Sequence, residues 1–209
     1  YNEVLFNKSI QKVKAKNIFK TVEYKTQSKD NLNKIIDITV EEKATGEIFA
    51  GAGAGTAGTS FTAGIKENNY LGLGIKLDAN ASITDDSLKG KFTVINPNFN
   101  NTDKTIKTSF ENSTDDFMTS SGYKTNRTGL TLGTEFEQYE NLFFAPSLRT
   151  SLEDLETNSN ASTSLKKQEG DYTDVYFDYG LNYDLRNSRY KPSSGNQTRF
   201  FQELPLVSD

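Results

Sequence analysis

Three glycines have the spacing of a nucleotide-binding loop. Gly53, Gly55 and Gly58 match the pattern GxGxxG, in which glycine lets the backbone approach a phosphate group. A dinucleotide site also requires a helix directly after the last glycine, because the phosphate binds at the helix N-terminus. Residues 60–66 instead alternate between apolar and polar, as a strand does. We therefore expect no nucleotide and no other cofactor.

Three pairs of acidic residues carry oxygens of the kind that bind calcium. They are Asp85-Asp86, Asp115-Asp116 and Glu153-Asp154. No EF-hand spacing surrounds them, and we expect most of them at solvated loop tips. The chain has no histidine and no cysteine, which removes Ser-His-Asp triads, Cys-His pairs and the usual zinc ligands. We expect no metal ion and no enzymatic activity.

The glycine segment is better interpreted as a strand built from small residues. On one face lie Ile48, Ala50, Ala52 and Ala54, and on the other lie Phe49, Gly51, Gly53 and Gly55. Glycine weakens a strand and often marks a bend or the close approach of another backbone. We therefore predict a weakly held first strand, which begins near Gly46.

Eight further segments alternate in the same way. Residues 73–84 alternate without an error, and residues 174–186 are nearly as regular. The other candidates centre on residues 61–65, 88–94, 106–110, 130–136, 142–148 and 198–207. With 34% hydrophobic and 11% aromatic residues, the chain is too aromatic for disorder and too polar for a large buried core. The sequence therefore predicts a mainly β fold with nine strands from Gly46 onward.

Two architectures separate polar and apolar rows in this way. In a soluble sandwich the apolar row packs against a second sheet, whereas in a membrane barrel it faces lipid and the polar row lines the lumen. Strands of 10–14 residues and mid-strand charges favour the barrel. Tight turns are predicted at 68–72, 96–102 and 140–141, and long polar loops at 112–126 and 157–170. We expect an antiparallel transmembrane β-barrel with further strands after the ninth, because bacterial single-chain barrels have even strand numbers.

Charged residues follow the eighth of these strands. Asp184, Arg186 and Arg189 lie where the strand runs into a turn that contains Pro192 and Gly195. Inside a barrel these three side chains are candidates for a luminal ion pair, with a structural role and no catalytic one.

Residues 1–43 differ in composition from the rest. Phe6, Ile10 and Val13 follow the i, i+4, i+7 spacing of a helix over residues 3–17, with Asn17 as a left-handed stop. Residues 20–26 and 34–42 predict a hairpin. Eight lysines against three acidic residues make residues 1–34 basic, although the whole chain carries a net charge of −4. This charge favours a solvated helix face over an acidic partner or nucleic acid.

Four segments resemble the BamA family of outer-membrane assembly factors, in that family's order and at similar spacing. They are residues 40–48 (VEEKATGEI), 64–74 (GIKENNYLGLG), 96–99 (NPNF) and 183–195 (YDLRN, then YKPSSG). The resemblance implies that residues 1–43 are the C-terminal part of the last α/β POTRA domain. It implies that residues 46–209 are the first nine or so strands, about the N-terminal half, of the barrel. Asn17 stands where the family often has glycine, and the family's later lumen loop with an arginine motif is not found.

The resemblance also implies a function. Such proteins insert client barrels into the outer membrane of Gram-negative bacteria, with their POTRA domains in the periplasm. The edge that pairs with client strands would comprise Ile48, Phe49, Ala50, Gly51, Ala52, Gly53, Ala54 and Gly55. Periplasmic turns would comprise Asn69, Tyr70, Leu71, Gly72, Asn96, Pro97 and Phe99. The implied partners are the outer-membrane bilayer, client proteins and periplasmic assembly lipoproteins, and we expect no nucleic acid.

Two alternatives come from other classes of protein. A passive outer-membrane pore or two-partner secretion transporter would use the same strands to line a channel. A soluble β-sandwich adhesin would bury the apolar rows between two sheets.

Overall fold

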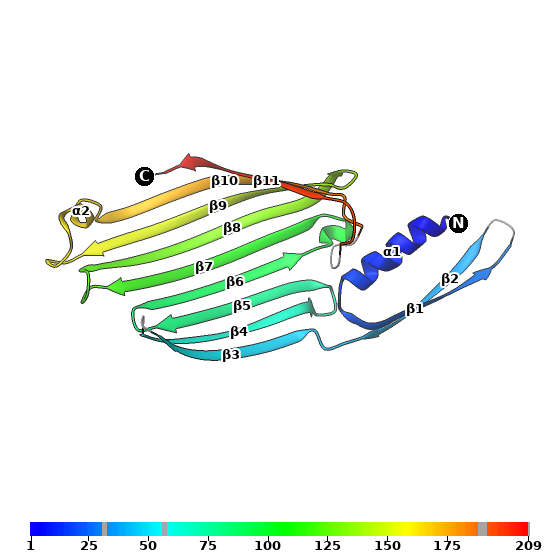
Figure 1. Cartoon of the computed structure of the whole chain (residues 1–209), viewed down its shortest axis with the longest axis horizontal. Helices are drawn as coiled ribbons and strands as arrows, with labels where there is room; N and C mark the ends of the chain where they lie inside the picture. The colour runs from blue at the N-terminus through cyan, green and yellow to red at the C-terminus, as the bar shows by residue number, and fades with distance from the viewer. Residues whose placement is uncertain (31–32, 56–57, 188–191, 209) are drawn as a thin grey trace.

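In the computed structural model, residues 1–30, 33–55, 58–187 and 192–208 are described. A helix and a hairpin come first, and a nine-stranded antiparallel sheet follows (Figure 1). No helix among the described residues has both the length and the apolar character needed to cross a membrane.

The N-terminal unit consists of α1 (Glu3–Ala15), β1 (Phe19–Ser28) and β2 (Lys34–Glu42). Asn2 caps α1, because its side chain accepts a hydrogen bond from the Leu5 N–H at 3.1 Å. The chain leaves the helix through Asn17 with a φ of 56°, so the predicted left-handed stop is confirmed. The rings of Phe6 and Tyr24 meet edge-on, with 4.9 Å between their centroids, and pack α1 on β1.

The sheet is a meander in which each strand pairs with its neighbours in sequence. Its strands are β3 (Gly46–Gly55), β4 (Gly58–Tyr70), β5 (Ile75–Thr84), β6 (Ser87–Asn96), β7 (Thr105–Phe117), β8 (Tyr123–Tyr139), β9 (Leu142–Thr157), β10 (Gly170–Asp184) and β11 (Gln197–Val207). The nine predicted strands and the antiparallel, mainly β fold are confirmed. The third strand begins at Ile75 and not at residue 73, because the chain turns through Leu71 with a φ of 55°.

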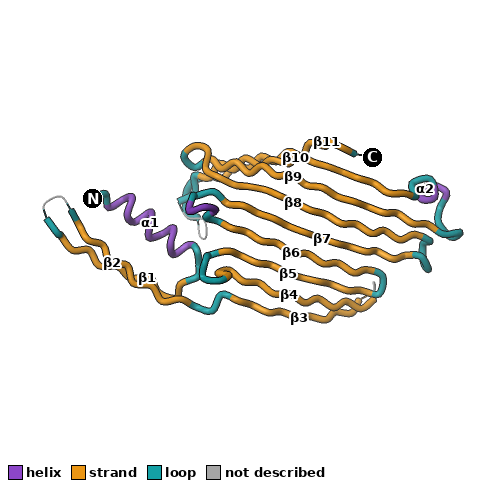
Figure 2. Tube along the Cα trace, turned by 180° about the vertical axis from the view of Figure 1, so that it is seen from behind, coloured by secondary structure: helices purple, strands orange, loops and turns teal. Residues whose placement is uncertain are grey.

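The two faces of the sheet differ in polarity across β4 to β8. Residues directly opposite one another form an apolar row across β4 to β8: Ile65, Ala79, Phe92, Phe110 and Leu130. The next row, on the other face, runs from β4 to β9: Lys66, Asp78, Thr93, Ser109, Thr131 and Arg149. The sheet is a single layer, and no second sheet covers it in the part of the chain that the structure describes (Figure 2). The arrangement of the sandwich adhesin is therefore absent from these residues.

One predicted loop is wrong. Residues 112–126 are expected to form a long polar loop, but β7 continues to Phe117 and β8 begins at Tyr123, so the connection is residues 118–122. Polar side chains predicted a loop, yet they extend the hairpin: Asn112 Nδ2 donates to Thr128 Oγ1 at 2.9 Å, and the rings of Phe117 and Tyr123 lie 5.3 Å apart. The connection after β9 is long, as predicted, and contains α2 (Thr163–Lys166).

The sheet has two unlike ends. The base, as we call the end beside the N-terminal unit, carries the turns at 71–74, 97–104 and 140–141. The far end carries the connections at 85–86, 118–122 and 158–169. The base also carries the connection between β10 and β11, residues 185–196, which is as long as the connection at 158–169. Short and long connections therefore occur at both ends, and the predicted asymmetry of loop length is wrong.

Candidate functional site

β3 forms one edge of the sheet (Figure 1). Among the described residues it pairs with β4 alone, and its ladder has no bulge. Every β3 residue is exposed except Phe49, which is half-buried, and Ile48 is 81% exposed. The predicted pairing residues Ile48–Gly55 thus lie together along one open edge.

The ladder fixes which backbone groups face outward from that edge. The N–H of Asn68 donates to the carbonyl of Thr45 at 3.3 Å, and hydrogen-bonded and non-hydrogen-bonded pairs alternate from there along an antiparallel ladder. The N–H and C=O groups directed away from β4 are therefore those of Ile48, Ala50, Ala52 and Ala54. These are the groups that an added strand would bond.

Side chains tie the base of β3 to the end of β4. Thr45 Oγ1 donates a hydrogen bond to Glu67, and the same carboxylate accepts one from the Asn69 N–H at 2.7 Å. The Asn68 side chain adds a bond to the Thr45 carbonyl at 3.3 Å. The chain between the N-terminal unit and the sheet is therefore anchored where β3 begins.

The residues of the predicted periplasmic turns all lie at the base. The first turn closes through the Gly72 N–H, which donates to the Asn69 carbonyl at 2.9 Å, and positive φ at Leu71 and Gly72 reverses the chain after Tyr70. The second follows β6: Asn96 Oδ1 accepts from the Asn98 N–H at 3.2 Å, and after Pro97 comes the short helix η1 (Phe99–Asn101).

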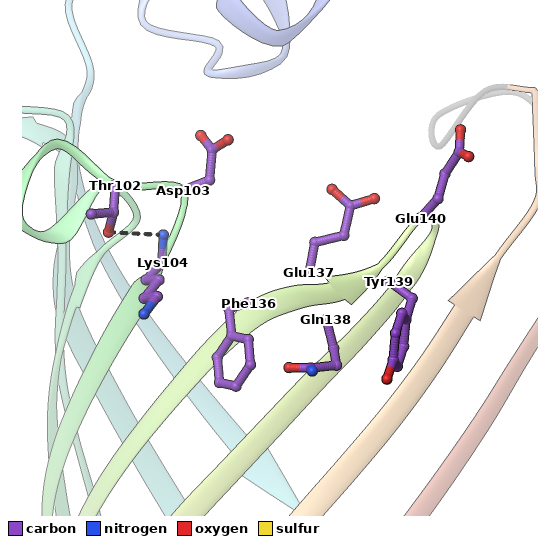
Figure 3. Close-up of a pocket in the computed structure, with 8 residues that line it drawn as sticks. All are labelled: Thr102, Asp103, Lys104, Phe136, Glu137, Gln138, Tyr139 and Glu140. Carbon is purple, nitrogen blue, oxygen red and sulfur yellow. Dashed lines mark hydrogen bonds between the residues drawn. The ribbon is translucent and has the colours of Figure 1, made fainter.

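A shallow groove of about 540 Å³ lies beside the second turn (Figure 3). The carboxylates of Asp103, Glu137 and Glu140 point to one side of it, and Phe136 and Tyr139 point to the other. Lys12 Nζ of α1 lies 3.5 Å from Asp103 Oδ2. Both side chains are mostly exposed, so this ion pair contributes little stability.

Asp184 and Arg186 come together at the end of β10. Arg186 Nε donates to Asp184 Oδ1 at 2.8 Å, and Nη2 donates to Oδ2 at 2.9 Å. This forked hydrogen bond raises the pKa of the Arg186 guanidinium above its ordinary value. The third predicted member, Arg189, lies outside the described residues. That the pair faces a lumen stays a prediction.

The polar face also holds a three-strand ion network that the sequence did not single out. Arg149 on β9 donates to Asp178 on β10, with 3.2 Å between Nε and Oδ2, and to Glu203 on β11. Its guanidinium carbon lies 4.5 Å from the centre of the Tyr176 ring. Arg149 therefore links the last three strands of the sheet.

Comparison with known proteins gives the family. A sequence model of the Omp85 superfamily domain matches residues 69–207, about two thirds of the chain, from the end of β4 to the end of β11. The chain belongs to the Omp85 superfamily. Its fold is that of an outer-membrane β-barrel protein, seen here as an open sheet.

A solved structure extends the likeness of this Omp85 chain to its N-terminal unit. The crystal structure of BamA from Haemophilus ducreyi lacking POTRA domains 1–3 matches with a TM-score of 0.69 over 98% of the chain, at 23% sequence identity. The match spans 42% of the BamA chain. At this identity the likeness concerns the fold, and the chain spans less than half of that relative.

The acidic pairs of the Omp85 chain lie in different elements. In the described part of the chain, no group of three or more acidic side chains is arranged to hold a metal ion. Asp85-Asp86 lies in a turn, but Asp115-Asp116 lies in β7 and Glu153-Asp154 in β9, so the expectation that most of the pairs lie at loop tips is wrong. The two pairs within strands form ion pairs with a neighbouring strand: Lys89 Nζ lies 3.3 Å from Asp115 Oδ1, and Arg127 Nε lies 4.0 Å from Glu153 Oε2.

Proposed function

We propose that the chain is part of an outer-membrane assembly factor that folds and inserts client β-barrel proteins in a Gram-negative bacterium. The observation that carries the proposal is the open edge of β3, in which seven of ten residues are alanine or glycine, in a chain of the Omp85 superfamily. On this proposal the apolar rows face lipid and the polar rows face the lumen.

The physical basis is the cost of an open strand edge in lipid. Each unpaired N–H or C=O group in hydrocarbon costs several kcal/mol, so spanning sheets must close. An edge with small side chains presents its backbone without steric obstruction, and a client strand satisfies those groups by β-augmentation. The outward groups of Ile48, Ala50, Ala52 and Ala54 are the proposed template.

We also propose a place for the N-terminal unit. Residues 1–43 are the C-terminal part of a periplasmic POTRA domain, and residues 46–209 are barrel. The direct connection of the unit to the base of β3 supports this arrangement. Its exposed lysines, among them Lys12, Lys14 and Lys16, provide a basic surface for periplasmic assembly lipoproteins.

Disulfide crosslinking tests the proposed edge. In the full-length protein, single cysteines at positions 48, 50, 52 and 54 should crosslink to the terminal strand of a stalled client, because these residues turn their backbone toward it. These 209 residues contain no cysteine, so this part of the protein adds no competing thiol. Cysteines at Ala79 and Phe92, on interior strands of the same apolar face, are the controls and should not react.

Two outcomes would reject the assembly role. The first is intact client insertion with no crosslink at any of the four edge positions. The second is ion conductance without client insertion, which would favour the pore or secretion transporter.

A further inference from the structure

β3 is held much more firmly at its base than at its tip. Phe49 lies directly opposite Gly64 in the ladder. A Cβ atom on Gly64 would lie 2.7 Å from Phe49 Cε1 and 2.8 Å from the carbonyl oxygen of Ala79. No side chain fits in that space, so the ring occupies a position that only glycine leaves open.

Charged neighbours reinforce the position of this ring. Lys66 Nζ lies 5.4 Å from the centre of the Phe49 ring, within the range of a cation–π contact. In the ladder Lys66 lies between Glu47 on β3 and Asp78 on β5. Together with the hydrogen bonds among Thr45, Glu67 and Asn69, these contacts concentrate the side-chain attachment of β3 within residues 45–50.

The tip of β3 lacks such contacts. A Cβ atom built on Gly51 or Gly55 would have no neighbour within 4 Å, and one on Gly53 would meet the hydroxyl of Ser60 at 3.0 Å. From residue 50 to residue 55 the sequence repeats Ala-Gly three times. A slip by two residues keeps every side chain on its own face. Within this repeat, such a slip also puts one alanine in the place of another and one glycine in the place of another.

We propose that Phe49 is a positioning residue that sets the register of β3 on β4. The Ala-Gly repeat fits β4 equally well in registers two residues apart, whereas the Phe49 ring fits over Gly64 in one register only. β3 thereby has two parts: a base, residues 45–50, whose register is fixed by side-chain contacts, and a tip, residues 51–55, which lacks such contacts. The ring lies on the face opposite to Ile48 and Ala50, so it leaves the outer backbone edge open.

The consequence for strand addition rests on the proposed function. A preorganised edge loses less conformational entropy on pairing than a mobile one. An incoming strand therefore pairs first with the base, at Ile48 and Ala50, and then extends along the tip. Phe49 fixes the register of β3 and, through it, the register of the client strand.

Disulfide formation within the chain measures the register. In the full-length protein, Ala50→Cys with Ala63→Cys reports the native pairing, and Ala52→Cys with Ala63→Cys reports a slip by two residues. Phe49→Ala should raise the ratio of slipped to native disulfide about tenfold. Gly64→Ala, which displaces the ring, should have a similar effect, and the two changes together should add little to either one.

Matched variants separate a role in register from a general loss of stability. Phe49→Tyr should restore the native ratio, because its ring also covers Gly64. Phe61→Ala removes an aromatic ring from the other face of the same hairpin and should leave the ratio unchanged. An unchanged ratio in Phe49→Ala would overturn the inference. The readout involves no client, so loss of client crosslinking with an intact effect of Phe49 on register would reject the proposed function alone.

Discussion

Replacing Ala52 by proline should reduce client insertion about a hundredfold while leaving the barrel folded. The Ala52 N–H points away from β4, so proline removes no bond of the β3–β4 ladder there. It removes a donor that the added strand needs, and an unpaired group in lipid costs several kcal/mol. Proline is tolerated on an edge strand when its missing N–H would face outward. The preceding Gly51 has no Cβ to clash with the ring.

The measurement is the rate of client insertion by the full-length protein in lipid vesicles, with heat-modified electrophoretic mobility as the test of folding. Gly51→Pro is the matched control, because the Gly51 N–H points toward β4 and its loss weakens the ladder itself. This control should impair folding as well as insertion. Normal insertion by a folded Ala52→Pro protein would show that clients do not pair with this edge.

Replacing Arg149 by methionine should destabilise the folded barrel by about 2–3 kcal/mol, because it leaves two facing carboxylates without their cation. The Asp178 side chain is 8% exposed, so water compensates it poorly, while Arg149 at 26% and Glu203 at 44% are partly solvated. This exposure places the expected loss below the 3–5 kcal/mol typical of breaking a fully buried pair. Methionine keeps the length of the stem and isolates the effect of charge.

Urea unfolding of the full-length protein in detergent measures this loss of stability. Lys91→Met is the control: Lys91 pairs with Glu111 at 3.0 Å, but both side chains are about half exposed, so its removal should cost less than 1 kcal/mol. Adding Asp178→Asn to Arg149→Met should restore part of the stability, since it removes the buried unpaired charge. Equal stability of the Arg149→Met and Lys91→Met proteins would show that the network does not hold β9, β10 and β11 together.

The strands were predictable because the period of two is a local property. β2 runs from Lys34 to Glu42 as predicted, and all nine sheet strands occur in the predicted order. Polar extensions were not predictable in this way. Residues 112–117 and 123–126 carry no apolar alternation. They form strands because the two segments lie opposite each other and satisfy each other's backbone N–H and C=O groups.

Contacts between strands could not be predicted without the register of the strands, which the sequence alone did not provide. The sequence shows charges within the strands, but the meeting of Arg149 and Asp178 with Glu203 depends on how β9, β10 and β11 align. Phe49 gave one usable signal, as a large ring in a row otherwise made of glycine. Pairing it with Gly64 follows only once the β3–β4 hairpin is placed in register.

On the proposed function, the apolar face of this sheet contacts lipid and the polar face is enclosed. Ala79 and Asn80 are neighbours on β5 with opposite orientations and similar, intermediate exposure. Spin labels at these two positions of the full-length protein in a bilayer test this orientation. The measured quantity is the relaxation of each label by oxygen and by a water-soluble nickel complex. We predict that the label at position 79 is relaxed mainly by oxygen and the label at position 80 mainly by nickel. Nickel accessibility at position 79, or equal behaviour of the two labels, would contradict the membrane orientation and with it the role of β3.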